Sequence, residues 1–100
     1  MNQYLNAVLD NAKELLKGEM TQISYETWIK PLEISNIVDN QVTLILKDSF
    51  KKDHVESRFH DLIVNTFNLI LQKNCNLKII SDIGLFAIIQ YFIDKKSSNK

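Results

Sequence analysis

The stretch Ser24-Tyr25-Glu26-Thr27-Trp28-Ile29-Lys30-Pro31-Leu32 decides how the first half of this chain folds, and it holds the only tryptophan and the only proline. It predicts one short helix, with Ser24 as the N-cap and Glu26 near the positive end of the helix dipole. Pro31 lacks an N–H group and disfavours helical geometry at Lys30, so the helix should end there. So short a helix is unstable alone in water, and apolar side chains must pin it to a core. The side chains available for this are Tyr25, Trp28, Ile29 and Leu32.

Length and composition indicate one domain without a strong charge. The chain has 100 residues, with 12 Lys and Arg against 12 Asp and Glu, so no net charge attracts nucleic acid or an anionic membrane. Met1 to Leu5 lack the features of a signal peptide, and the apolar stretch Ile83–Ile93 is shorter than the ~20 residues that span a bilayer. We therefore expect a cytoplasmic protein with no membrane partner. Cys75 is the only cysteine, which excludes an intramolecular disulfide.

A longer amphipathic helix is predicted before the short helix that carries Trp28, which we call the tryptophan helix. Apolar residues at the spacing of an amphipathic helix run from Leu5 to Leu16, and Gly18 is the expected C-terminal cap. After Pro31 the pattern changes to two short strands, Ile34–Val38 and Gln41–Lys47, around the turn residues Asp39-Asn40, which predicts a β-hairpin. In the second strand the apolar residues Val42, Leu44 and Leu46 should face one way, and Gln41, Thr43 and Lys47 the other.

The longest predicted helix runs from Phe50 to Lys73, with Asp48 and Ser49 as capping candidates. A third strand, Leu77 to Ser81, follows it. The prediction is an α+β fold in which helices pack on a small three-stranded sheet, in the order α-α-β-β-α-β. This order is similar to that of an RNA-binding KH domain, but a chain with only two glycines lacks the Gly-x-x-Gly clamp.

The expected organisation has three parts. Residues 1–82 form the domain, and residues 83–94 form an apolar extension that reads equally as helix or strand. A segment that is apolar on nearly every side should be buried, in its own fold or against a partner such as a second copy. Residues 95–100 are expected to be a disordered polar tail.

Motifs for catalysis are missing from the chain. Two glycines cannot build a phosphate-binding loop, and no Ser-His-Asp or Cys-His arrangement has local support. His54 and His60 lie about 240° apart around the predicted helix, so they do not share a face as metal ligands would. We therefore expect no enzymatic activity, no cofactor and no metal.

A basic cluster with one aromatic residue surrounds the start of the long helix. Lys47, Lys51, Lys52 and Arg58, with Phe50 among them, are either a weak contact for single-stranded nucleic acid or a solvated helix start. Phe50 precedes the regular apolar stripe by five residues. It is therefore either a core residue at the helix entrance or an exposed anchor for a partner.

Several of these residues resemble a known family. The stretch 24–32, the segment Asp39-Asn40-Gln41-Val42-Thr43-Leu44, Phe50 and the block Glu56-Ser57-Arg58-Phe59 are similar to the N-terminal domain of the bacterial replication initiator DnaA. The resemblance covers Leu5 to Ser81. It implies a module that self-associates, contacts the replicative helicase and regulators of the initiator, and binds single-stranded DNA weakly. The partner-binding residues that it implies are Ser24, Thr27, Trp28, Asp48, Phe50 and Lys51.

The chain also departs from that family pattern. Ser24 stands where many members have an acidic residue, and Leu9 stands where a tryptophan used in self-association is usual. The self-association residues that the resemblance implies are therefore Leu5 and Leu9. The motor and DNA-binding parts of an initiator are absent from this sequence. The leading hypothesis is therefore a stand-alone module that binds a replication initiator, a replicative helicase or a regulator and modulates initiation. The alternatives are a weak single-strand binder, and a degenerate fragment without selected function.

Overall fold

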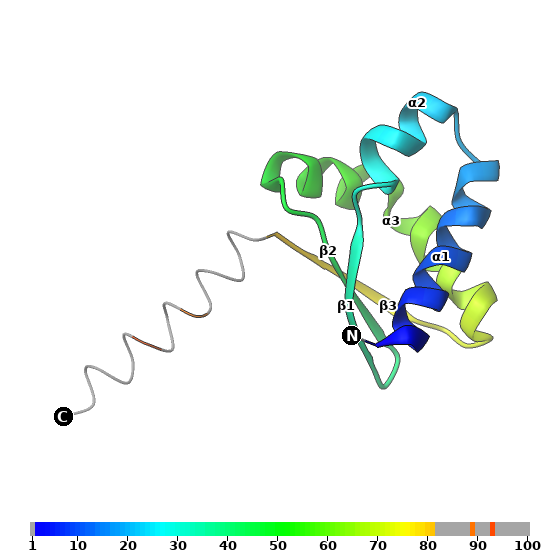
Figure 1. The fold of residues 1–100 in the computed structure, drawn as a ribbon, viewed down its shortest axis with the longest axis vertical. Coiled ribbons are helices and arrows are strands. Elements are labelled where there is room, and N and C mark those ends of the chain that lie inside the picture. Colours follow the sequence, from blue (N-terminus) through cyan, green and yellow to red (C-terminus); the bar gives the residue numbers. More distant parts are fainter. Residues whose placement is uncertain (1, 82–88, 90–92, 94–100) are drawn as a thin grey trace.

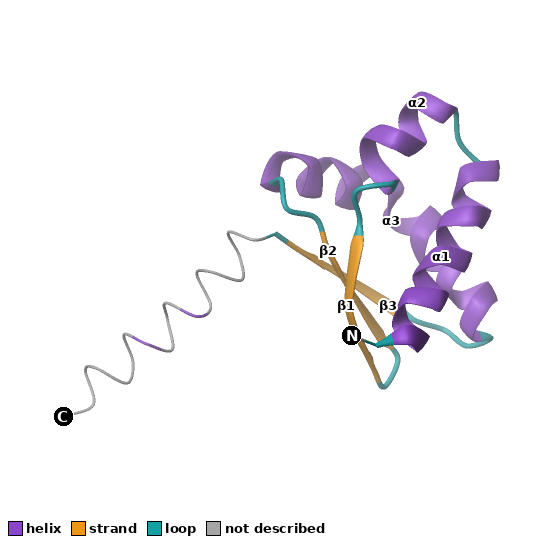
Figure 2. Cartoon of the chain, in the orientation of Figure 1, coloured by secondary structure: helices purple, strands orange, loops and turns teal. Residues whose placement is uncertain are grey.

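The computed structural model describes residues 2–81, 89 and 93, and it confirms the predicted α+β fold and element order. Helices α1 and α3 lie side by side, and the strands run next to them (Figures 1 and 2). The helical elements are α1 (Gln3–Gly18), α2 (Gln22–Ser24), the π-helical turn η1 (Tyr25–Ile29) and α3 (Ser49–Leu71). The strands are β1 (Glu33–Val38), β2 (Gln41–Ile45) and β3 (Asn76–Ile80).

The sheet has the order β1-β2-β3, so β2 is its central strand. Strands β1 and β2 form the predicted antiparallel hairpin, and Asp39 in its turn adopts a positive φ of 54°, which an aspartate tolerates. Strand β3 pairs with β2 in parallel, and α3 makes the crossover that a parallel connection requires. Because β3 runs parallel to β2, the two strands end side by side. The end of β3 therefore lies near the start of α3 (Figure 1).

The core lies between the helices and one face of the sheet. Val42, Leu44 and Leu46 are at most 1 % exposed and face the core, as the alternation predicts. Thr43 points to the other face but is also buried, because β2 is central and its register partners Asn36 and Lys78 flank it. The buried apolar residues of the core are Val8, Leu9, Ala12, Leu16, Ile29, Leu32, Val42, Leu44, Leu46, Val55, Ile63, Phe67, Cys75 and Ile79.

The predicted role of Gly18 is wrong. Gly18 is the last residue of α1 and has no positive φ, so it is not a left-handed C-terminal cap. The C-cap is instead Glu19, whose N–H donates to the carbonyl of Leu16 at 3.0 Å. A Cβ added at Gly18 would meet no atom within 4 Å.

Both ends of α3 are fixed by specific contacts. The carboxylate of Asp48 accepts hydrogen bonds from the N–H groups of Phe50 (2.9 Å) and Lys51 (3.2 Å), which confirms its predicted capping role. The helix ends at Leu71, before the predicted Lys73, because Gln72 adopts a left-handed conformation with a φ of 56°. Lys73 then donates from Nζ to the carbonyl of Asp39 at 2.9 Å, which ties this end to the hairpin turn.

The predicted apolar extension (residues 83–94) and polar tail (95–100) lie outside the described residues, apart from Ile89 and Ile93, which are exposed. Among the described residues, none of the helices is both long and apolar enough to cross a membrane.

We expect Gly18→Ala to stabilise the protein by about 0.5 kcal/mol, because alanine loses less conformational entropy than glycine in a helix. The measurement is the free energy of unfolding in urea, with Gly18→Asn as the matched variant. Asparagine suits a left-handed cap better than alanine does. An asparagine variant more stable than the alanine variant would show that Gly18 caps the helix after all.

Candidate functional site

The N-cap of the tryptophan helix is Thr21, three residues before Ser24, so the prediction of Ser24 as the cap is wrong. The hydroxyl of Thr21 accepts a hydrogen bond from the N–H of Ser24 at 3.1 Å, and the helix continues from α2 into η1. The last turn is wide, because the N–H of Lys30 donates to the carbonyl of Tyr25, five residues back, at 2.9 Å. The helix then ends immediately before Pro31, as predicted.

Core packing and one long-range hydrogen bond hold this helix in place. Ile29 is 0 % exposed and Leu32 is 2 % exposed, so both predicted anchors belong to the core. Lys13 of α1 donates from Nζ to the carbonyl of Lys30 at 2.8 Å, which satisfies a free carbonyl at the helix end. Burial lowers the pKa of Lys13, while the nearby carboxylate of Asp10 acts in the opposite direction.

Tyr25 makes a second link between the short helix and α1. Its side chain packs against the core, and the ammonium group of Lys17 lies 5.8 Å from the centre of its ring, within range of a cation–π interaction. Burial raises the pKa of Tyr25, and the carboxylate of Glu14 acts in the same direction. The tryptophan helix is therefore fixed to α1 on this side and to the core beneath it.

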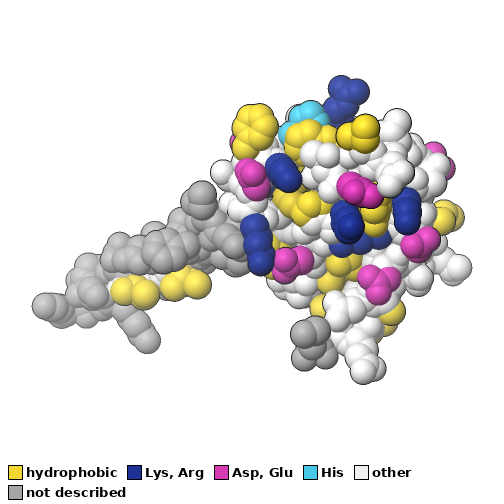
Figure 3. Space-filling view, turned by 45° about the horizontal axis from the view of Figure 1, so that its top comes forward, with side chains coloured by type: hydrophobic (Ala, Val, Ile, Leu, Met, Phe, Trp, Pro, Cys, Tyr) yellow, Lys and Arg dark blue, Asp and Glu magenta, His cyan; other side chains and the backbone are white. Residues whose placement is uncertain are grey.

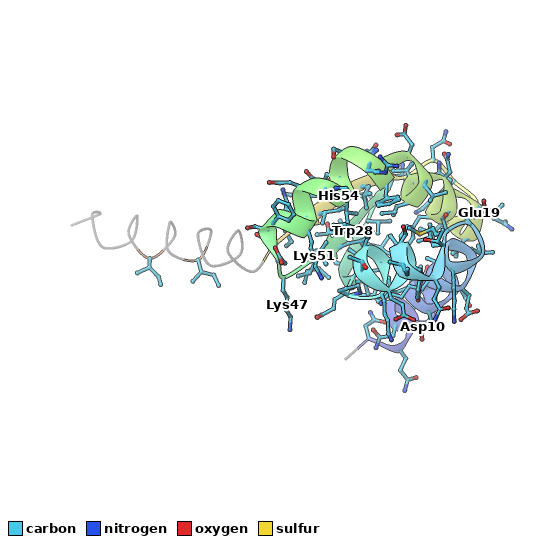
Figure 4. The ribbon with its side chains drawn as sticks, turned by 90° about the horizontal axis from the view of Figure 1, so that it is seen from above. Asp10, Glu19, Trp28, Lys47, Lys51 and His54 are labelled. Carbon is cyan, nitrogen blue, oxygen red and sulfur yellow. The ribbon has the colours of Figure 1, made fainter. Side chains whose placement is uncertain are left out.

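Trp28 projects from η1 onto α3, where it stacks on His54 (Figure 4). The two ring centres are 4.0 Å apart and the planes are 25° from parallel. The ring centres of His54 and Phe59 are 5.9 Å apart with the planes inclined at 62°, so the three rings follow one another in a row. This contact joins two helices that are separated by the whole hairpin, and it orients the indole at the surface.

Phe50 lies on the first turn of α3 and is 76 % exposed, which excludes the core interpretation and leaves the exposed one. It precedes His54 by four residues, so the two side chains are neighbours on one helix face. Exposed Phe50, stacked His54 and half-buried Trp28 therefore form an aromatic surface, which we call the aromatic face. Ser24 and Thr27 are half-buried on the short helix beside Trp28, and Asp48 is exposed at the cap of α3.

Two of the four predicted cations are paired with carboxylates of the chain. Lys47 pairs with Glu33 at 3.6 Å, and Lys52 pairs with two acidic residues of α3, Asp53 (3.7 Å) and Glu56 (3.4 Å). Within the described part of the chain, no ion pair neutralises Lys51 or Arg58. Half of the predicted nucleic-acid contact is thus occupied by carboxylates of the same chain.

Of the two residues assigned to self-association, Leu9 is 8 % exposed and belongs to the core, while Leu5 is half-buried at the start of α1. A contact with a second copy would therefore fall to Leu5 and its exposed neighbours. His54 was missing from the predicted site, although its position one turn after Phe50 on the same helix face was a usable signal.

A shallow hollow on α3 continues the aromatic face. It is lined by His54, Ser57, Arg58, Phe59 and Leu62. The hydroxyl of Ser57 donates to the carbonyl of His54 at 3.2 Å. The residues described contain no group of three or more His, Cys, Asp or Glu side chains that could hold a metal ion. This region offers an exposed aromatic surface with Lys51 and Arg58 beside it, two cations that have no ion-pair partner among the residues the structure describes.

A comparison with known protein families relates most of this chain to one of them. The family model described as the DnaA N-terminal domain matches residues 6–68, which is more than half of the chain. The matched span runs from α1 into α3 and contains the whole aromatic face.

We expect Trp28 and His54 to be energetically coupled by about 1 kcal/mol, because stacked rings contribute beyond the area that they bury. The measurement is a double-mutant cycle in urea unfolding with Trp28→Leu and His54→Leu. His60 lies on the exposed side of the same helix and contacts Asp61, so a cycle of Trp28→Leu with His60→Leu serves as the control. Equal coupling energies in the two cycles would contradict the stack.

Proposed function

Because the chain belongs to the DnaA N-terminal domain family, which implies a replication-related protein-interaction domain, we propose that its aromatic face binds a replication protein. The candidate partners are a replication initiator, a replicative helicase or a regulator of the initiator. Binding one of them in the cytoplasm would modulate the start of replication. The family membership supports the class of partner, and the geometry of the face supports the place where it binds.

The observation that carries this proposal is the exposure of Phe50. A phenylalanine that is 76 % exposed leaves most of its apolar surface in water, where burial by a partner would release about 25 cal/mol per Å². Aromatic residues of this kind often contribute most of the energy of an interface. Phe50 is also not needed by the core, so its exposure has no structural explanation within the described residues.

The surroundings of Phe50 are already ordered for binding. Asp48 fixes the first turn of α3 through two hydrogen bonds, and Trp28 is held against His54 by stacking. A partner therefore meets side chains that lose little further freedom on binding, which raises affinity. Ser24 and Thr27 supply hydroxyl groups at the edge of the face, as expected of a polar rim around an apolar centre.

We expect Phe50→Ala to weaken binding to the replication initiator or the replicative helicase at least tenfold, a loss of about 1.4 kcal/mol or more. The measurement is the affinity of each variant for the initiator and for the helicase, both purified from the same cell, in a surface binding assay. The control is Leu69→Ala, because Leu69 is 69 % exposed on the far part of α3. Its binding should equal that of the unchanged protein.

The free energy of unfolding of both variants should lie within about 0.5 kcal/mol of that of the unchanged protein, because both substitutions remove exposed side chains. The proposal fails if neither replication protein binds, or if Phe50→Ala binds as tightly as Leu69→Ala.

A further inference from the structure

Charges on the first half of α3 are divided between two sides of the helix. Lys52 lies with Asp53 and Glu56 in mutual ion pairs, so this group carries no excess positive charge. Lys51 and Arg58 are seven residues apart, which places them about 20° from each other around the helix and about 10.5 Å apart along it. Neither of these two has an ion-pair partner within the described residues.

The two unpaired cations lie beside the aromatic face. His54, which stacks on Trp28, sits between them at three residues from Lys51 and four from Arg58, so all three share one side of α3. In Figure 3 hydrophobic, His and Lys or Arg side chains lie close together on the visible face, with Asp and Glu side chains interspersed among them. An unpaired cation next to an exposed apolar surface favours a ligand that offers a carboxylate beside an apolar side chain.

The opposite wall of the face, on η1, carries one acidic side chain. Ser24 and Thr27 are neutral, and Glu26, the acidic residue of η1, is exposed and accepts a hydrogen bond from Gln22 Nε2 at 3.2 Å. Asp48 uses its carboxylate to cap α3. Asp48 keeps its negative charge but directs its carboxylate at the N–H groups of Phe50 and Lys51, whereas Lys51 and Arg58 have no carboxylate partner among the described residues and are free to pair with a ligand.

We infer that the aromatic face selects an acidic protein segment, in which apolar side chains pack on Phe50 and Trp28 while carboxylates pair with Lys51 and Arg58. This inference rests on the proposed function and names the chemistry of the partner. A nucleic-acid ligand is less well matched, because Lys47 and Lys52 already pair with carboxylates and two cations remain for a phosphate backbone.

Two synthetic peptides of about four helical turns test the inference. They share one apolar stripe of Leu and Phe and differ only in their flanking residues, which are Glu in one peptide and Lys in the other. Neither contains tryptophan, so the fluorescence of Trp28 reports binding at the face. We expect the Glu peptide to bind at least tenfold more tightly than the Lys peptide at low salt, with the ratio falling as salt screens the charges.

Charge reversal identifies the residues responsible. Lys51→Glu and Arg58→Glu should each reduce the preference for the Glu peptide at least threefold. Lys78→Glu changes the net charge of the chain equally, but Lys78 lies exposed on β3, away from α3's cations, and should leave the preference unchanged. The inference is overturned if neither peptide binds, if both bind equally, or if the Lys78 variant matches the Lys51 variant.

A thymidine oligonucleotide is the third ligand. Tighter binding of the oligonucleotide than of the Glu peptide, lost on Lys51→Glu, would also overturn the inference, in favour of a nucleic-acid site. The proposed function fails separately, through the Phe50→Ala assay with replication proteins. Equal peptide binding together with a Phe50-dependent partner would leave the docking face in place and remove only its charge selectivity.

Discussion

The burial of Ile29 is the interaction on which the rest of the candidate site depends. The helix that carries Trp28 has about two turns, too few to persist in water by its own hydrogen bonds. Ile29 is fully buried in the core, and Lys13 satisfies the carbonyl of Lys30 at the helix end. These two contacts fix the rotation of the helix, and the rotation decides that Trp28 points at α3. The stack on His54 follows from that direction.

The position of this helix, together with the cap of α3, explains why aromatic side chains lie together at one place on the surface. Asp48 starts α3 at a defined residue, so Phe50 occupies the first turn and His54 the second, on one helix face. The short helix brings Trp28 to this face from the other side. The site thus combines an element fixed by core packing with one fixed by a helix cap, and Phe50 is the group left open to a partner.

The fold could be predicted because its signals are local: helical and alternating periodicity, turn residues and a proline stop. The caps could not all be predicted, since Thr21 and Ser24 both carry a hydroxyl and only the path of the chain selects Thr21. The ion pair of Lys47 could not be predicted for a related reason. Lys47 finds Glu33 only through the pairing of β1 with β2, and no local pattern reports such a contact. The exposure of Phe50 likewise depends on tertiary packing.

The proposed docking of replication proteins uses the face shared by η1 and α3. The most direct test maps the NMR chemical shifts of the protein while a replication initiator or replicative helicase is added. We expect the indole N–H of Trp28 and the amides of Phe50 and Lys51 to shift most. Shifts confined to the furrow between α1 and α3, around Leu15 and Leu69, with the Trp28 signal unchanged, would contradict docking at this face.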